Sequence, residues 1–298
     1  MNMNKPYEFP PITLFKQGDS GSVVRMRALV DTEAFQKSEP LVIPVGTQAD
    51  GQPVFFDIAK MPHLLIAGRS GAGKSMWLHS VITGLLCKNS PHRVNLLLID
   101  PKYTEFGDYR DLPHLAVPVA RGETKGVEAL RWAVTEMERR FDLIRSVGVR
   151  DLAGYNRAAK DDPDMEHLSQ VVIIIDELAD LMMTAPDQVE GAICRLLQMG
   201  RAVGMHLLIA TQCPRPDILT VLIAANIPTR IAFAVASQED SCCILETAGA
   251  ETLNGRGDML FLPIGTSNPI RLQGAYVSGD ETERIVAFIK EHNGEKTE

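Results

Sequence analysis

The feature that most constrains this chain is residues 63–86, whose pattern predicts a strand, a glycine-rich loop and a helix. Residues 63–67 form a short apolar run, typical of a buried parallel strand. Residues 68–75, GRSGAGKS, then fit G-x-x-x-x-G-K-[ST] at every fixed position. Residues 76–86 follow with apolar side chains at helical spacing. A loop of this composition between a strand and a helix predicts a phosphate-binding site.

The residue types in this loop match the chemistry of a bound nucleoside triphosphate. Glycines let successive N–H groups converge on phosphate oxygens, and the helix N-terminus adds partial positive charge. Lys74 supplies a cation for the β- and γ-phosphates, and Ser75 a hydroxyl for Mg²⁺. We therefore expect ATP and Mg²⁺ as cofactors; the alternative is a glycine-rich turn that matches by chance. The candidate cofactor-binding residues are Gly68, Arg69, Ser70, Gly71, Ala72, Gly73, Lys74 and Ser75.

Length and composition indicate a globular protein. The 298 residues allow one large domain, alone or with a small one, and 45% hydrophobic residues support a substantial core. No run of 18 apolar residues predicts a membrane span, and the start, MNMNKPYEFPP, has no apolar segment of a signal peptide. We therefore expect a cytoplasmic protein without direct membrane insertion. The five cysteines form no C-x-x-C pair and are expected to be reduced.

The acidic charge balance argues against a generally basic nucleic-acid-binding surface. The formal net charge is −8, with a sequence pI of about 5.4. Any contact with DNA must therefore be local, in a few loops or in the centre of a ring that concentrates cations.

Alternation of strands and helices predicts an α/β fold with a mostly parallel sheet covered on both faces. We expect an arm at 1–40, a main domain at 41–292 and a polar tail at 293–298. Candidate strands are 41–45, 53–58, 63–67, 94–100, 115–119, 171–175, 206–210, 230–234, 257–262 and 271–276. Candidate helices are 24–35, 76–86, 123–147, 189–200, 240–247 and 281–292.

Polar residues follow several predicted strands at their carboxyl ends, where ligands bind in such sheets. Asp176 follows the most apolar strand and suits Mg²⁺, whereas Glu177 suits polarising a water for attack on the γ-phosphate. Gln212, after the neighbouring strand, is positioned to contact the γ-phosphate or that water. The alternatives are a solvated acidic turn and a polar strand cap. Asp100 is expected either at the same site or as a cap of its loop.

Hydrolysis at such a site often uses an arginine from a neighbouring subunit. Each candidate is equally compatible with a surface role or a salt bridge. The candidates are Arg139, Arg140, Arg201, Arg230 and Arg256.

Seven blocks in order resemble the motor domain of the FtsK/SpoIIIE family of DNA translocases. They are MPHLLIAGRSGAGKS, LLLIDPK, ALRWAVTEMERRFDLIRSVGVRDLAGYN, VVIIIDELADLM, GRAVGMHLLIATQCPRP, ANIPTRIAF and GAETLNGRGDMLFLP. The resemblance implies a RecA-like P-loop NTPase core with a short N-terminal β-rich extension. It also implies hexameric rings around double-stranded DNA, with ATP between subunits.

The resemblance assigns roles to individual residues. It gives Lys74 and Ser75 the Walker A roles, Asp176 and Glu177 the Walker B roles, and Gln212 the sensor role. It places TQCPRP and residues 217–228 facing DNA. The candidate DNA contacts there are Arg215, Thr220 and Asn226.

The sequence also departs from the family pattern. We expect a stand-alone motor, without the membrane-spanning and winged-helix modules of the cell-division type. Such a motor is either encoded on a mobile element or works with partner proteins, including membrane-bound ones. Gln212-Cys213-Pro214-Arg215 replaces Gln-Arg-Pro-Ser, and Asp240-Ser241-Cys242 replaces Asp-Ser-Arg, so positive charge is lost at two places.

Three functions remain open at this point. The first is an ATP-driven translocase on double-stranded DNA, gripping phosphates without sequence preference. The second is a coupling or secretion ATPase of the conjugation or type VII kind. The third is a regulatory nucleotide-binding switch, against which the intact Glu177 argues.

Overall fold

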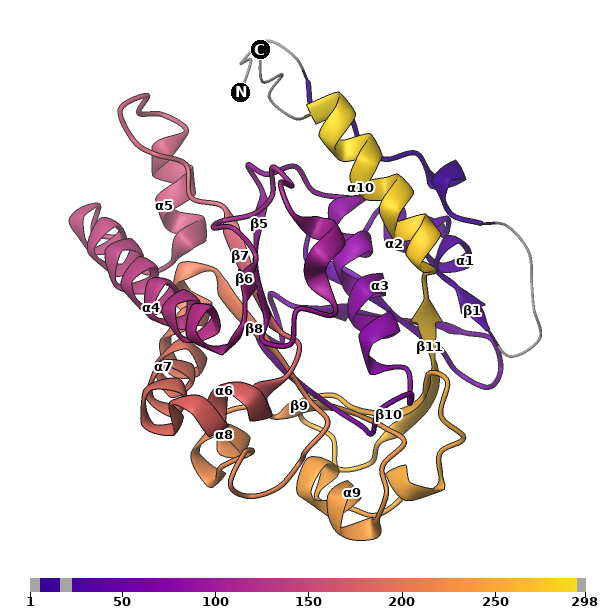
Figure 1. The fold of residues 1–298 in the computed structure, drawn as a ribbon. Helices are drawn as coiled ribbons and strands as arrows, with labels where there is room; N and C mark the ends of the chain where they lie inside the picture. Colours follow the sequence, from indigo (N-terminus) through magenta and orange to yellow (C-terminus); the bar gives the residue numbers. More distant parts are fainter. Residues whose placement is uncertain (1–5, 17–22, 294–298) are drawn as a thin grey trace.

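The computed structural model describes residues 6–16 and 23–293, which form one sheet with helices on both faces (Figure 1). The strand order is β3-β2-β11-β10-β9-β4-β8-β7-β5-β6, and β1 pairs with β11. The strands are β1 (Val24–Arg25), β2 (Val42–Thr47), β3 (Pro53–Asp57), β4 (His63–Ala67), β5 (Val94–Asp100), β6 (Ala120–Arg121), β7 (Gln170–Ile175), β8 (Met205–Thr211), β9 (Thr229–Phe233), β10 (Asp258–Leu262) and β11 (Ile270–Tyr276).

The strands from β9 to β6 run parallel and form the half of the sheet that carries the glycine loop. Strand β4 lies between β8 and β9, and β7 lies on the far side of β8. All five residues of β4 and all seven of β8 are buried. Burial on both faces explains why these strands are continuous apolar runs rather than alternating ones. The expectation of an α/β fold with a mostly parallel sheet is confirmed.

The other half of the sheet is antiparallel. Strands β10, β11, β2 and β3 pair in that order, so the β2–β3 hairpin extends the same sheet. Trp77, on the helix after the glycine loop, donates from Nε1 to the carbonyl of Val45 over 2.8 Å. Phe35 and Phe56 from the front of the chain belong to the same buried core as the central strands. The N-terminal β-rich extension thus packs on the main domain, as expected.

Helices cover both faces of this sheet (Figure 1). Helices α3 and α10 lie on one face, and α4, α6 and α7 on the other. The α-helices are α1 (Met26–Val30), α2 (Glu33–Gln36), α3 (Lys74–Leu86), α4 (Glu123–Ser146), α5 (Leu152–Ala159), α6 (Leu178–Thr184), α7 (Pro186–Met199), α8 (Val221–Ala225), α9 (Gln238–Leu245) and α10 (Gly279–Asn293). Short 3-10 turns are η1 (Ile12–Leu14), η2 (Phe106–Tyr109), η3 (Gly200–Val203) and η4 (Ala250–Thr252).

Several local predictions were wrong. The helix predicted at 24–35 is broken into β1, α1 and α2, because Thr32 caps a new helix by accepting from the N–H of Phe35. The strand predicted at 115–119 is only a single bridge at Leu115, and β6 lies just after it. Helices α5, α6 and α8 were not anticipated. Asn293 belongs to α10 rather than to the predicted tail; residues 294–298 lie outside the described part.

No helix within residues 6–16 and 23–293 is both long and apolar enough to cross a membrane.

Candidate functional site

The glycine loop is enclosed by the ends of its neighbouring strands. The N–H of Gly68 donates to the carbonyl of Thr211 at the end of β8, over 3.3 Å. The N–H of Arg69 donates to the carbonyl of Ala234, just after β9, over 2.9 Å. On the other side, the N–H of Gly257 donates to the carbonyl of Ala72 over 2.8 Å. The parallel strands and the turn before β10 therefore fix the loop at one edge of the sheet.

Backbone conformation explains the second glycine of the motif. Gly73 has φ +114° and forms the N-cap of α3. A Cβ at this position would lie 2.5 Å from the backbone nitrogen of Gly257. Only glycine therefore fits here without displacing the turn before β10.

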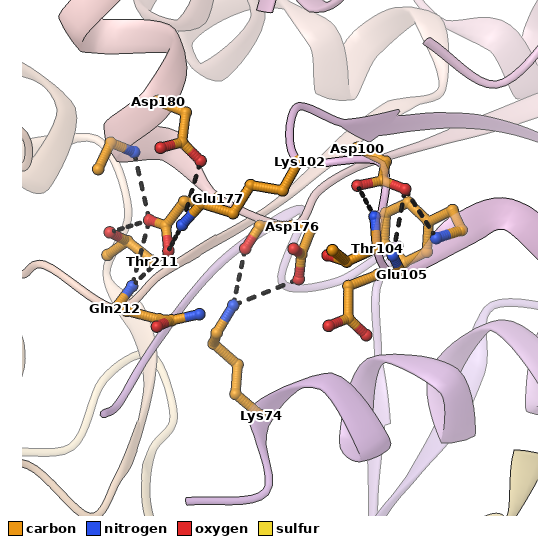
Figure 2. Close-up of polar contacts among 12 residues, drawn as sticks. Lys74, Asp100, Lys102, Thr104, Glu105, Asp176, Glu177, Asp180, Thr211 and Gln212 are labelled. Atoms are coloured by element: carbon orange, nitrogen blue, oxygen red, sulfur yellow. Dashed lines mark hydrogen bonds and ion pairs between the residues drawn. The ribbon is translucent and has the colours of Figure 1, made fainter. Parts of the chain in front are cut away.

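Lys74 and Asp176 meet at the centre of the site (Figure 2). The Lys74 ammonium donates to the Asp176 carbonyl over 2.7 Å and lies 3.3 Å from Oδ1 of the same residue. Both side chains are almost fully buried. The ends of β4 and β7 thus bring the two expected residues together, 102 positions apart in sequence.

The oxygen donors near Lys74 suit a magnesium ion. Burial raises the pKa of the Asp176 carboxyl above its usual range; Lys74 opposes this shift, whereas Glu105 adds to it. Ser75, the second residue of α3, follows Lys74 and offers a hydroxyl. Mg²⁺ prefers such hard oxygen ligands and usually binds through one or two carboxylates together with substrate phosphates. Ser75 and Asp176 therefore fit the ion, and the described residues contain no cluster of three acidic, His or Cys side chains that would cage it alone.

Glu177 is held rigidly at the end of β7. Its Oε1 accepts from the Thr211 hydroxyl over 2.7 Å and from the N–H of Ala179, at the start of α6, over 3.3 Å. The N–H of Gln212 lies 3.2 Å and 3.1 Å from its two oxygens. Glu177 therefore also caps α6, and the Gln212 backbone joins β8 to this carboxylate (Figure 2).

Lys102 completes the surroundings of Glu177 and was missed by the sequence analysis. Its ammonium lies 3.9 Å from Glu177 Oε2 and 3.3 Å from Asp180 Oδ2. The Lys102 side chain is 45% exposed, whereas that of Glu177 is 1% exposed. These two carboxylates raise the pKa of Lys102, against the effect of burial. The signal in the sequence was Pro101-Lys102 directly after a strand that ends at this edge.

Asp100 shapes the loop that follows β5 rather than facing the nucleotide site. Its fully buried carboxylate accepts from the N–H groups of Thr104, Glu105 and Phe106, each over 3.1 Å. Of the two roles expected for Asp100, the structure shows the second, in which its carboxylate caps the loop. The loop in turn carries Glu105, a second residue that the sequence analysis missed, toward the start of α3 (Figure 2).

Two of the proposed trans-acting arginines are buried inside their own chain. The Arg140 guanidinium donates to the carbonyls of Ser169 and Val203 over 2.7 Å and 3.1 Å, and to Glu136 over 2.7 Å. These carbonyls precede β7 and β8, so Arg140 lies at the edge of the sheet opposite the glycine loop.

Arg230 on β9 is also held by partners within its own chain. Its guanidinium donates to three backbone carbonyls, of Ala224, Ile227 and Ile244, and pairs with Glu246. The positions of Arg140 and Arg230 argue against the trans role, because neither guanidinium is presented to another subunit.

The remaining arginines are exposed. Arg139 forms ion pairs with Glu136 and Glu166, and Arg201 lies in η3 before β8. Arg256 lies in the turn that contacts the glycine loop, with φ +54°. We therefore keep Arg139, Arg201 and Arg256 as candidates.

The residues expected to contact DNA lie in and around α8. Arg215 is 61% exposed and pairs with Asp217 over 2.9 Å. Thr220 caps α8 by accepting from the N–H of Ile223, and Asn226 ends it with a side-chain hydrogen bond to the Leu222 carbonyl. The amide of Asn226 is therefore used locally, whereas Arg215 presents a cation at the surface.

Comparison with known proteins gives the family. The FtsK/SpoIIIE family model matches residues 25–216. A DNA translocase FtsK of Caldanaerobacter subterraneus subsp. tengcongensis is 52% identical over 271 residues, which are 90% of this chain and 38% of that protein. DNA translocase SftA of Bacillus subtilis is 48% identical over 272 residues, 91% of this chain and 29% of that protein. The chain thus spans less than half the length of these relatives.

Solved structures share the fold. The cytoplasmic domain of the type VII secretion ATPase EccC of Thermomonospora curvata superposes with a TM-score of 0.77 at 25% identity, over 90% of this chain and 34% of that one. The pCW3 conjugation coupling protein TcpA, determined with ATPγS, gives 0.74 at 23% identity, over 92% and 80%. The sheet order and the enclosed glycine loop point to the same fold as these matches. The chain belongs to the FtsK/SpoIIIE family and has the P-loop ATPase fold of that family.

Proposed function

We propose that this chain is an ATP-driven motor that moves double-stranded DNA. The observation that carries the proposal is the meeting of Lys74 and Asp176 beside a restrained Glu177, in a chain about half identical to DNA translocases. A regulatory switch would not need a buried carboxylate held at this place by three separate donors.

In the proposed mechanism the loop N–H groups and Lys74 bind the β- and γ-phosphates. Ser75 and Asp176 would hold Mg²⁺, which would supply charge neutralisation for the phosphate oxygens. Glu177 orients the attacking water and accepts its proton, and its bonds to Thr211 and the Gln212 backbone keep the carboxylate aligned. The Gln212 side chain senses the γ-phosphate at the end of β8.

The finer parts of the proposal are a hexameric ring and contacts to the DNA backbone. Arg139, Arg201 and Arg256 are the candidates for completing a neighbouring subunit's site. Because the net charge of the chain is −8, we expect it to contact DNA through a small part of its surface where cations gather. Arg215, three residues after Gln212 and 61% exposed, is a surface cation that suits such a contact.

The test is the steady-state ATPase rate with and without linear duplex DNA at two salt concentrations, with Lys74→Ala as the blank. We expect strong stimulation by any duplex sequence, fading at higher salt because phosphate contacts release counterions. Turnover that does not respond to DNA would contradict the proposal. It would favour a coupling or secretion ATPase, a function named for two of the proteins that share the fold.

A further inference from the structure

We propose that Glu105 is a further carboxylate of the Mg²⁺ site, which takes part in holding the cation together with Ser75 and Asp176. This inference rests on the proposed nucleotide site but assigns a role to a residue outside the Walker motifs. Glu105 comes from the loop between β5 and η2, a part of the chain with no role in the mechanism above.

The first support is that the Glu105 backbone is fixed. Asp100, fully buried at the end of β5, accepts from the N–H of Glu105 and from the N–H groups on either side of it. A carboxylate that takes three N–H donors holds its loop in one conformation. The position from which the Glu105 side chain leaves the backbone is therefore set by the same sheet edge that positions the glycine loop.

The second support is that the Glu105 side chain is also oriented. Nε2 of His79 lies 3.5 Å from Glu105 Oε2, and Nδ1 of His79 lies 2.7 Å from the hydroxyl of Tyr109. His79 is one helical turn after Ser75 on α3, so the two side chains share a face of that helix. His79 thus holds the Glu105 carboxylate beside α3, the helix whose first turn contains Ser75.

The third support is electrostatic. A hydrogen bond with His79 holds the pKa of Glu105 below its usual range, and the Ser75 hydroxyl and the Lys74 ammonium act in the same direction, against burial. Glu105 is also among the charges that raise the pKa of Asp176. Glu105 therefore interacts with the two residues expected to hold the cation.

The charges around Lys74 predict how Glu105 should affect nucleotide binding. Lys74 forms its ion pair with Asp176, so Glu105 adds a second carboxylate beside a single ammonium group. A divalent cation relieves this charge, whereas the phosphates of a metal-free nucleotide are repelled by it. Glu105 should therefore weaken metal-free nucleotide binding and increase the gain in affinity that Mg²⁺ provides.

The test measures the dissociation constant of a fluorescent ATPγS in EDTA and in Mg²⁺ for wild type and Glu105→Gln. The Mg²⁺-dependent gain in affinity should fall about tenfold in the variant, the size seen when a partner of a metal site is lost. Binding in EDTA should be unchanged or tighter. Asp108→Asn, three residues along and exposed, is the matched control and should retain the wild-type gain.

The outcomes are distinguishable. An unchanged Mg²⁺-dependent gain in Glu105→Gln would overturn the proposal, as would equal loss of affinity with and without Mg²⁺, which is the result of a merely structural role. If Glu105→Gln does not fold, Glu105→Asp keeps the charge but shortens its reach and should reduce the same gain. If the wild-type chain binds nucleotide no better in Mg²⁺, the proposed ATPase function itself fails before any variant is compared.

Discussion

At the scale of single residues, three neighbours hold the Glu177 carboxylate in place. Thr211, Ala179 and Gln212 all donate to Oε1, so the amide oxygen of a glutamine can accept the same three bonds. Glu177→Gln should therefore bind ATP and hydrolyse it about 10²–10⁴-fold more slowly, the usual contribution of a general base. Nucleotide binding and single-turnover hydrolysis measure both effects. Wild-type turnover in this variant would refute the assigned mechanism.

Lys102 should affect turnover through Glu177 and Asp180. Its ammonium faces both carboxylates, and without it the two negative charges repel each other across the site. We expect Lys102→Ala to reduce kcat severalfold with little change in the affinity for ATP, and Lys102→Arg to restore part of the loss. Lys125→Ala is the control, because Lys125 is exposed and pairs with Glu128 on α4. Equal effects of Lys102→Ala and Lys125→Ala would rule out this role.

At the scale of elements, the glycine loop and the turn before β10 form one packed unit. Gly73→Ala places a Cβ 2.5 Å from the nitrogen of Gly257, whereas Gly71, also at positive φ, has open space around it. Gly71→Ala should cost about 1–2 kcal/mol in the free energy of unfolding, from the backbone conformation alone. Gly73→Ala should cost more, because the turn must move.

Urea unfolding of the nucleotide-free chain compares these two variants directly. Similar losses for both would mean that the contact between the loop and β10 does not constrain position 73.

The amino ends of β4 and β8 carry two buried histidines. Burial lowers the pKa of His63 to about 4 and of His206 to about 3. The unfolded chain takes up these protons near pH 6.5, but the folded chain does not, so stability is complete above pH 6.5 and falls as the pH drops toward 4. In this pH range, each of these histidines lowers the free energy of unfolding by up to about 1.4 kcal/mol for every unit that the pH falls.

Replacing His206 isolates its share of this pH dependence. The free energy of unfolding of His206→Gln should fall less between pH 7 and pH 5 than that of wild type, whatever its value at pH 7. Lys125→Gln, an exposed substitution that leaves every histidine in place, is the control, and its curve should run parallel to that of wild type. A His206→Gln curve parallel to wild type would contradict the assignment.

At the scale of the whole molecule, the sequence predicted the central strands and the glycine loop well, because strands buried on both faces are visible as apolar runs. Thr32 as a helix cap and the short β6 were missed, since single capping bonds and two-residue strands leave little periodicity. Asp176, Glu177 and Gln212 could be placed together from strand ends alone.

The burial and the contacts of residues that pair with distant segments could not be predicted. Arg140 and Arg230 are buried because backbone carbonyls from other segments accept their donors, and a lone arginine in sequence carries no sign of this. The partners of Lys102 and Glu105 also come from other segments, since Lys102 faces Glu177 and Asp180, and Glu105 contacts His79.

The central claim is that ATP hydrolysis by this chain moves double-stranded DNA, and displacement of a third strand tests it most directly. A triplex-forming oligonucleotide is annealed to one end of a linear duplex, and its release is followed after the chain and ATP are added. The account predicts release that requires ATP, slows as the distance to the triplex grows and is lost in Lys74→Ala. DNA-stimulated hydrolysis without any release of the third strand would contradict it.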